Sequence, residues 1–153
     1  MDTTFTTLSE ETCRELLART AVGRLAVDAG GRPEIFPVNF VVHDGDVVFR
    51  TGAGTKLAAA ALMHHVAFEI DGYDPDGHVV WSVVVKGWAQ QIERMEDVYD
   101  AEMLPLATWV DSDKPDFVRI RADEITGRRF PLAEDVTVDA SVGWPAPLTN
   151  TDP

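Results

Sequence analysis

The sequence predicts a mainly β protein whose strands close, or partly close, into a β-barrel with short α-helices at its edges. Three observations lead to this fold class: short β-branched segments, turn sequences between them, and helical patterning confined to three short stretches. A β-sandwich is the main alternative, because it is built from the same kind of strands. The 153 residues suit one domain with one hydrophobic core, and no linker or internal repeat divides them. We expect the core to cover about residues 9–130, followed by a loosely attached tail at 131–153.

The first helix is expected at residues 9–19, where Ser9 can cap the N-terminus and early glutamates suit the helix dipole. A second, alanine-rich helix is expected at residues 55–63, begun by Thr55. The third covers residues 95–104 and is ended by Pro105.

Strand patterning occupies most of the remaining chain. DAGG at 28–31 and HDGD at 43–46 are strong hairpin turns, and YDPDG at 73–77 is turn-like. The expected strands lie at residues 22–28, 34–43, 46–51, 66–71, 79–92 and 117–130.

The charge balance narrows the range of partners. With 13 basic and 26 acidic residues the net charge is −13, so nucleic acid and anionic membrane surfaces are not expected partners. The N-terminus lacks the pattern of a signal peptide, no apolar run approaches the ~18 residues of a membrane span, and Cys13 is the only cysteine. We therefore expect a cytoplasmic protein without disulfides, in which Cys13 is buried and inert.

One segment has the residues of a phosphate site. The sequence RTGAGTK at 50–56 runs from a strand through a glycine-containing loop into a helix. An anion could be bound here by free backbone N–H groups, by the hydroxyls of Thr51 and Thr55, and by the charges of Arg50 and Lys56. A hairpin exit and a capped helix with a solvated lysine explain the same residues equally well. Leu57 stands where both a Walker loop and a dinucleotide fingerprint need another residue, so neither is supported.

Other reactive side chains give weaker signals. His64 and His65 are adjacent, while His43 and His78 lie in expected turns, so we expect no metal site. No Ser-His-Asp or Cys-His arrangement can be identified, and the catalytic residues, if any, stay unknown. An enzyme whose bound cofactor carries the chemistry need not contain a recognisable acid–base pair.

Five segments stand in register over residues 21–88: VGRLAV at 22–27, PVNFVV at 37–42, VVFRT at 47–51 with TK at 55–56, VAFEID at 66–71 and WSVVVKGWA at 81–89. Together they resemble the pyridoxamine 5'-phosphate oxidase-like family of FMN-binding split barrels, in the branch that includes nitroimidazole-resistance proteins. The similarity continues more weakly through residues 118–129.

The resemblance implies a six-stranded antiparallel split β-barrel and a homodimer with FMN in clefts at its interface. It also implies that one strand follows the flavin ring, that Thr51 and Lys56 hold the phosphate, and that a strand of the partner subunit completes the cleft. The region that grips pyridoxal phosphate in the true oxidases has no match, so vitamin B6 oxidation is not implied. The cofactor-binding residues implied are Val38, Asn39, Phe40, Arg50, Thr51, Thr55, Lys56, Trp81, Ser82 and Val83.

The leading functional hypothesis is an FMN-dependent oxidoreductase acting on a small organic substrate. A deazaflavin coenzyme in the same cleft is a close alternative. A flavin- or haem-binding module without turnover, and a structural dimer with an empty cleft, are alternatives from other classes.

Overall fold

The computed structural model describes residues 5–52, 55–104, 106 and 116–135, and most of them form strands. Three short helices accompany the strands: α1 (Glu10–Arg19), α2 (Lys56–Ala61) and α3 (Met95–Glu102). The strands are β1 (Thr6–Thr7), β2 (Val22–Asp28), β3 (Pro33–His43), β4 (Asp46–Thr51), β5 (His64–Asp74), β6 (Val79–Gln91) and β7 (Asp116–Pro131).

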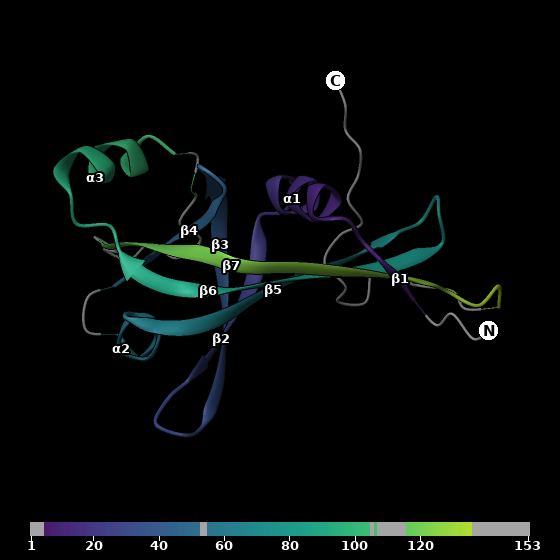
Figure 1. Ribbon diagram of the computed structural model, residues 1–153, viewed down its shortest axis with the longest axis horizontal. Coiled ribbons are helices and arrows are strands. Elements are labelled where there is room, and N and C mark those ends of the chain that lie inside the picture. The colour runs from purple at the N-terminus through teal and green to yellow at the C-terminus, as the bar shows by residue number, and fades with distance from the viewer. Residues whose placement is uncertain (1–4, 53–54, 105, 107–115, 136–153) are drawn as a thin grey trace.

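The sheet closes on itself. Its strand order is β1-β7-β4-β3-β2-β5-β6, and β6 pairs in addition with β7, so β2 to β7 form a ring (Figure 1). All pairs are antiparallel. The predicted fold class, a six-stranded antiparallel split β-barrel with short helices, is confirmed.

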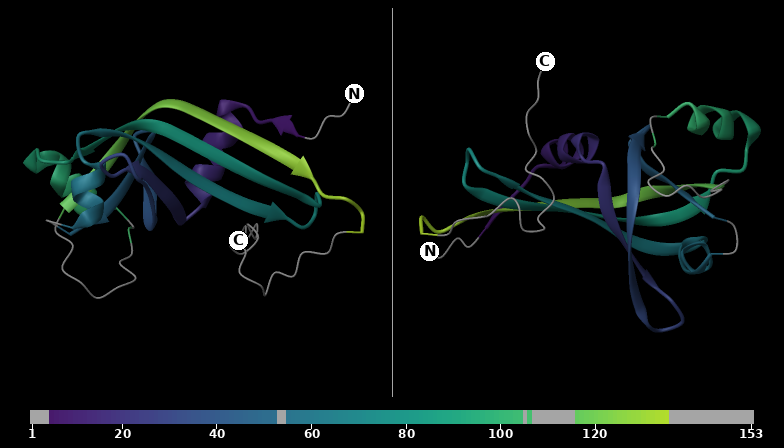
Figure 2. Two further views of the ribbon diagram at one scale, coloured as in Figure 1. Left: turned by 90° about the horizontal axis from the view of Figure 1, so that it is seen from below. Right: turned by 180° about the vertical axis from the view of Figure 1, so that it is seen from behind.

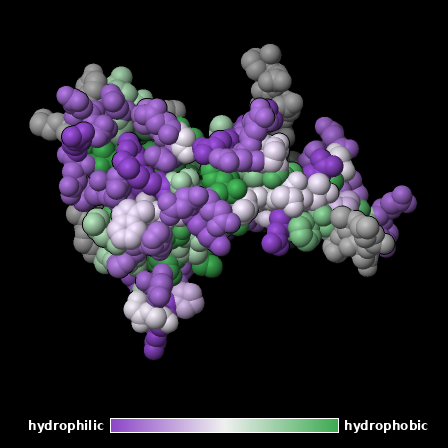
Figure 3. Space-filling model, in the orientation of Figure 1, coloured by the Kyte–Doolittle hydropathy of each residue, from purple (hydrophilic) through white to green (hydrophobic). Residues whose placement is uncertain are grey.

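The ring is uneven because some strands pair over only part of their length. β2 meets β5 only at residues 24–26 and 67–69, and β4 meets β7 only at residues 116–120 of β7. Beyond these contacts β5, β6 and β7 continue together as an arm, which carries β1 along its edge (Figure 2). Figure 3 shows hydrophobic residues where the wide part of the molecule narrows into this arm.

The core lies inside the ring, where alternate residues of every strand point inward. Phe40, Phe49 and Phe68 are at most 2% exposed, and the rings of Phe40 and Phe68 meet edge to face at 4.7 Å. Gly23 lies directly beneath Phe68, because a Cβ at this position would be 2.1 Å from Cζ of that ring. A second, smaller cluster around Val48 lies where α3 covers the outer face of β4 and β7.

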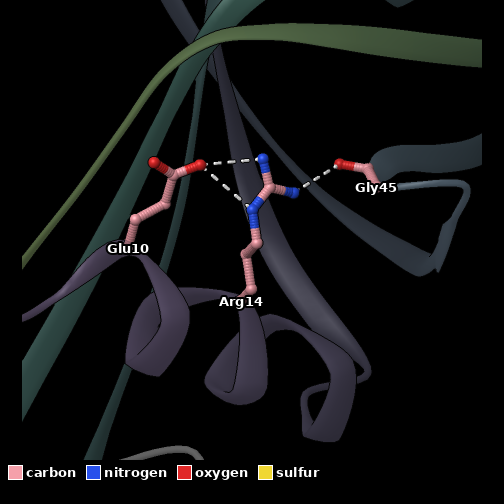
Figure 4. A network of polar contacts seen from close by, with 3 residues as sticks. All are labelled: Glu10, Arg14 and Gly45. Atoms are coloured by element: carbon pink, nitrogen blue, oxygen red, sulfur yellow. Dashed lines mark hydrogen bonds and ion pairs between the residues drawn. The ribbon is translucent and has the colours of Figure 1, made fainter.

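Helix α1 begins where its sequence predicts. The Ser9 hydroxyl accepts a hydrogen bond from the backbone N–H of Thr12 at 3.1 Å. Arg14 then fixes the helix to the β3–β4 turn: it donates to Glu10 Oε1 at 3.0 and 3.1 Å and to the Gly45 carbonyl at 3.2 Å (Figure 4). The apolar side of the helix, which includes the buried Cys13, faces the arm. Burial raises the pKa of the Cys13 thiol, as expected of an inert cysteine.

Replacing the cap should therefore loosen α1. Ser9→Ala is expected to lower the free energy of unfolding by about 1 kcal/mol, the usual value of a lost N-cap. Ser9→Asp should keep most of that free energy, because a carboxylate accepts the same hydrogen bond. Urea unfolding measures both variants, and an alanine variant as stable as the parent would show that the cap contributes nothing.

Two predictions concern the end of α3 and the C-terminal tail. The expected helix stop at Pro105 and the tail at 136–153 lie outside the described residues, whereas residues 132–133 are attached to the β5–β6 turn. There His78 Nε2 lies 3.0 Å from the Ala133 carbonyl, and the Leu132 N–H donates to the His78 carbonyl. Among the helices that the structure describes, none is both long and apolar enough to span a membrane.

Candidate functional site

The end of β4 carries a buried hydroxyl. Thr51 is 4% exposed and is the one buried polar side chain among the described residues. Its Oγ1 lies 3.1 Å from Oγ1 of Thr55, which in turn accepts from the backbone N–H of Ala58 and so caps α2. The two threonines that the sequence singles out are therefore in direct contact, one on each side of the loop residues 53–54, which lie outside the described part.

The two cations of the predicted cradle are placed differently from each other. Lys56 is the first residue of α2; its side chain is 68% exposed and its ammonium pairs with the Glu34 carboxylate on β3. Arg50 points to the face of β4 opposite Thr51, as alternation along a strand requires, and stacks 4.9 Å from the Phe117 ring centroid. Lys56 is thus available near the threonine pair, whereas Arg50 does not converge with Thr51.

Arg50 has a further property of interest. Its Nε is buried and, among the described residues, has no hydrogen-bond partner. A buried donor without a partner is costly, so it is the kind of group that a ligand acceptor stabilises.

The predicted ring-binding strand lies beside this region. The β3–β4 ladder ends at the Phe40–Phe49 pair, so β4 does not cover the part of β3 that precedes Phe40. Val38 and Phe40 point into the core, at 8% and 2% exposure, while Asn39 is half-buried on the outward face. Before Phe40, therefore, the backbone of β3 has no partner on β4, and the side chains of Val38 and Phe40 are turned into the core.

On β6, alternation separates the three predicted residues. Trp81 and Val83 are 6% and 0% exposed and belong to the hydrophobic core, where Trp81 covers Gly72. Ser82 points outward and lies opposite Asp71 of β5. Of the three, only Ser82 presents its side chain on the outer face of the barrel.

Sequence reasoning missed a charged cluster on this outer face. Nη1 of Arg24 on β2 lies 3.1 Å from both Glu69 Oε2 and Asp71 Oδ1 on β5. Both carboxylate side chains are only 29% exposed. Burial, assisted by the neighbouring Asp71, raises the pKa of Glu69 to about 7 in spite of Arg24. The cluster lies between Asn39 on β3 and Ser82 on β6 in the strand order.

A hollow along α1 is a poor alternative site. It is lined by Glu10, Glu11, Arg14, Glu15 and Ala18, and its three carboxylates would repel an anionic cofactor.

A closed six-stranded barrel with a threonine pair at the end of one strand places the chain in the class of split-barrel proteins. The family model for pyridoxamine 5'-phosphate oxidase matches residues 9–129. The chain therefore belongs to this family, and the resemblance seen in the sequence is confirmed.

Individual relatives agree with this assignment. The FAD binding protein from Mycobacterium smegmatis is 38% identical, with a TM-score of 0.73 over 83% of this chain and 99% of its own. The uncharacterized protein Rv0080 from Mycobacterium tuberculosis is 34% identical over 128 residues, which are 80% of this chain and 84% of the relative. A candidate 5-nitroimidazole antibiotic resistance protein from Bacteroides thetaiotaomicron covers 82% of this chain and 89% of its own with a TM-score of 0.65. At 15% identity it shows the shared fold alone.

Proposed function

We propose that this chain binds a flavin nucleotide, FMN in the first instance, and acts as an oxidoreductase on a small organic substrate. The observation that carries the proposal is the buried Thr51 hydroxyl, paired at 3.1 Å with Thr55 and followed by the exposed Lys56. The similar protein from Mycobacterium smegmatis is described as FAD binding, and FAD contains the same phosphate next to its ribityl chain.

The residues present fit such a phosphate. Two hydroxyls and one ammonium supply donors, and charge-assisted hydrogen bonds to phosphate are among the strong ones. Lys56 is held only by Glu34 among the described residues, so a phosphate can replace that carboxylate as its partner. A chain with a net charge of −13 needs such a local cation to attract an anion.

The ring of the cofactor would lie along the backbone of β3 near Val38, where β4 no longer covers the strand. In this proposal a second copy of the chain completes the cleft with the outward face of its β6, through Ser82. The side chains of Trp81 and Val83 have no direct part in it, because they are buried in the protomer core.

A bound flavin supplies hydride or electron transfer itself. The chain has to bind the phosphate, orient the ring and exclude water. No described residue needs to act as a nucleophile.

Replacing Lys56 tests the phosphate site. Lys56→Ala should weaken FMN binding by roughly tenfold or more, because one charge-assisted contact is lost and Glu34 is left uncompensated. Lys56→Arg should retain part of the affinity, since the charge remains while the geometry changes. Fluorescence titration of FMN measures both.

Two controls make the result specific. Glu34→Gln removes the carboxylate that competes for Lys56 and should bind FMN at least as tightly as the parent. Arg32→Ala removes a cation from the exposed β2–β3 turn and should change nothing. If Lys56→Ala binds FMN like the parent, the phosphate lies elsewhere.

Turnover separates an enzyme from a binding module. An enzyme loaded with FMN should oxidise a nicotinamide donor steadily when a reducible substrate is supplied. Tight FMN binding without any turnover, across nicotinamide and reduced deazaflavin donors, would instead favour a storage or sensing role.

A further inference from the structure

Arg50 differs from the other half-buried arginines of the molecule. Among the basic residues that the structure describes, three are half-buried: Arg24, Arg50 and Arg119. Arg24 pairs with the carboxylate of Glu69 at 3.1 Å, and Arg119 lies 3.7 Å from that of Asp46. No described carboxylate pairs with Arg50, although the chain has 26 acidic residues. Its positive charge is therefore uncompensated within the described part of the chain.

The side chain of Arg50 is nevertheless held in place. Its guanidinium carbon lies 4.9 Å from the centroid of the Phe117 ring, so the planar group is stacked rather than extended into solvent. Its Nε is buried and has no hydrogen-bond partner among the described residues. Such a donor is costly, and a ligand that stays bound removes this cost more fully than one that comes and goes. A resident cofactor fits that requirement better than a transient substrate does.

The place of Arg50 in the sheet connects it with the cofactor ring rather than with the phosphate. Alternation along β4 directs its side chain outward and that of Thr51 inward. The β3–β4 ladder ends at the Phe40–Phe49 pair. Asn39 and Arg50 are the next residues of the two strands, and both side chains face outward. The ring is proposed to lie along this stretch of β3, beside the Arg50 guanidinium.

A flavin ring has hydrogen-bond acceptors along its pyrimidine edge, at N1 and at two carbonyl oxygens, and none along its dimethylbenzene edge. Hydride transfer from a nicotinamide donor breaks one C–H bond, forms an N5–H bond and brings two electrons and one proton to the ring. The ring thereby gains one negative charge, which N1 and the C2 carbonyl oxygen share. A cation at this edge therefore binds the reduced ring more tightly than the oxidised ring.

We infer that Arg50 donates to the pyrimidine edge of the flavin ring and stabilises the negative charge of the reduced cofactor. The inference rests on the proposed function, because it requires a flavin in the cleft beside β3. Its consequence is a higher reduction potential of the bound flavin, since a group that binds one of two states more tightly shifts the equilibrium toward that state. Lys56 has no such effect at the phosphate, because the charge of the phosphate is the same in both states.

The reduction potential of bound FMN tests this role. The parent and Arg50→Gln are loaded with FMN and reduced anaerobically together with a reference dye of known potential. Relative to its affinity for oxidised FMN, Arg50→Gln should bind reduced FMN roughly tenfold more weakly than the parent does. This ratio corresponds to a potential that is lower by about 30 mV for a two-electron couple. A mildly alkaline pH prevents proton uptake by the reduced ring from masking the change.

Further variants show whether the charge is responsible. Arg50→Met is also neutral but keeps an apolar stem against Phe117, so it should lower the potential as Arg50→Gln does. Arg50→Lys keeps the charge with another geometry and should retain part of the difference. Arg32→Gln removes the same charge from the exposed β2–β3 turn and should leave the potential unchanged. Melting curves identify the variants that are folded, and either neutral variant is sufficient for the comparison.

An unchanged or higher potential in the neutral variants would overturn the inference. Affinities for oxidised and reduced FMN that fall equally leave the potential unchanged, and would show that Arg50 only supports the fold or holds the ring in place. A decrease of the same size in Arg32→Gln would also overturn it, because the effect would then come from net charge alone. Failure of the parent to bind FMN or FAD would instead contradict the proposed function, and titration with the oxidised flavins detects this before any potential is measured.

Discussion

Gly87→Ala should lose roughly 3 kcal/mol or more of unfolding free energy, or fail to accumulate as folded protein. Gly87 lies at an irregularity where β6 and β7 change register: Lys86 pairs with Glu124 but Gly87 pairs with Ala122. A Cβ at Gly87 would lie 1.9 Å from the carbonyl oxygen of Arg121, which is backbone and cannot rotate away. The two longest strands of the barrel would have to separate at this point.

Gly77→Ala is the matched control. A Cβ at Gly77 would meet Oδ2 of Asp74 at 3.2 Å, and that carboxylate is the end of a movable side chain. Urea unfolding should place Gly77→Ala close to the parent and Gly87→Ala far below it. If both variants unfold at the same urea concentration, the close approach of β6 and β7 is not what requires glycine at position 87.

The bulge at Gly87 also has a role in the architecture. Bulges bend strands and help a sheet to close, and this one leaves Asp123 of β7 without a register partner on β6. Glycine is the residue that permits the backbones to approach at such a bend. In the sequence this position is only a glycine between Lys86 and Trp88. The need for glycine there becomes clear only when β7 is seen packed beside β6.

Local patterning was enough to predict most of the elements. β2 and β4 have the predicted bounds, because alternation and flanking turns define them on both sides. β5 runs from His64 to Asp74 rather than over residues 66–71. Its two ends contain polar residues and a glycine, so the apolar alternation that predicts a strand stops short of them. The short β1 was not predicted, because two exposed threonines have no strand signal of their own.

The candidate site was predictable where it is local in the sequence. Thr51 and Thr55 are four residues apart and meet as expected, at 3.1 Å. Arg50 was grouped with them by its place in the 50–56 segment, and Trp81 and Val83 by resemblance. Strand alternation directs the side chains of all three to other environments. The Arg24–Glu69 pair joins residues 45 positions apart, and only the register between β2 and β5 brings them together.

The homodimer that the resemblance implies stays a prediction. In the structure β6 lies between β5 and β7, and Trp81, Val83 and Val85 fill the core of the chain. Only the outward side chains of β6 are therefore placed to meet a second copy.

The second large effect concerns the phosphate of the cofactor. FMN should bind on the order of 100-fold more tightly than riboflavin, because the phosphate makes at least two charge-assisted hydrogen bonds worth about 1.5–3 kcal/mol each, less the cost of removing it from water. Thr51 and Thr55 supply the hydroxyls and Lys56 the charge. FAD should resemble FMN in this comparison, whereas a deazaflavin that binds more tightly than either would identify the alternative coenzyme.

The comparison of FMN with riboflavin is most informative when it is repeated with the Lys56→Ala variant. In Lys56→Ala the difference between FMN and riboflavin should shrink, while the affinity for riboflavin itself stays the same. A variant that loses affinity for both flavins equally would indicate a change in the protein rather than the loss of a phosphate contact.

Titration of the cofactor-free protein with FMN and with riboflavin, followed by flavin fluorescence, tests the central claim most directly. We expect saturable binding of FMN at one equivalent per chain and riboflavin binding weaker by about two orders of magnitude. Equal affinities for the two flavins would remove Thr51, Thr55 and Lys56 from the phosphate site, and no binding of FMN, FAD or a deazaflavin would contradict the proposed function itself.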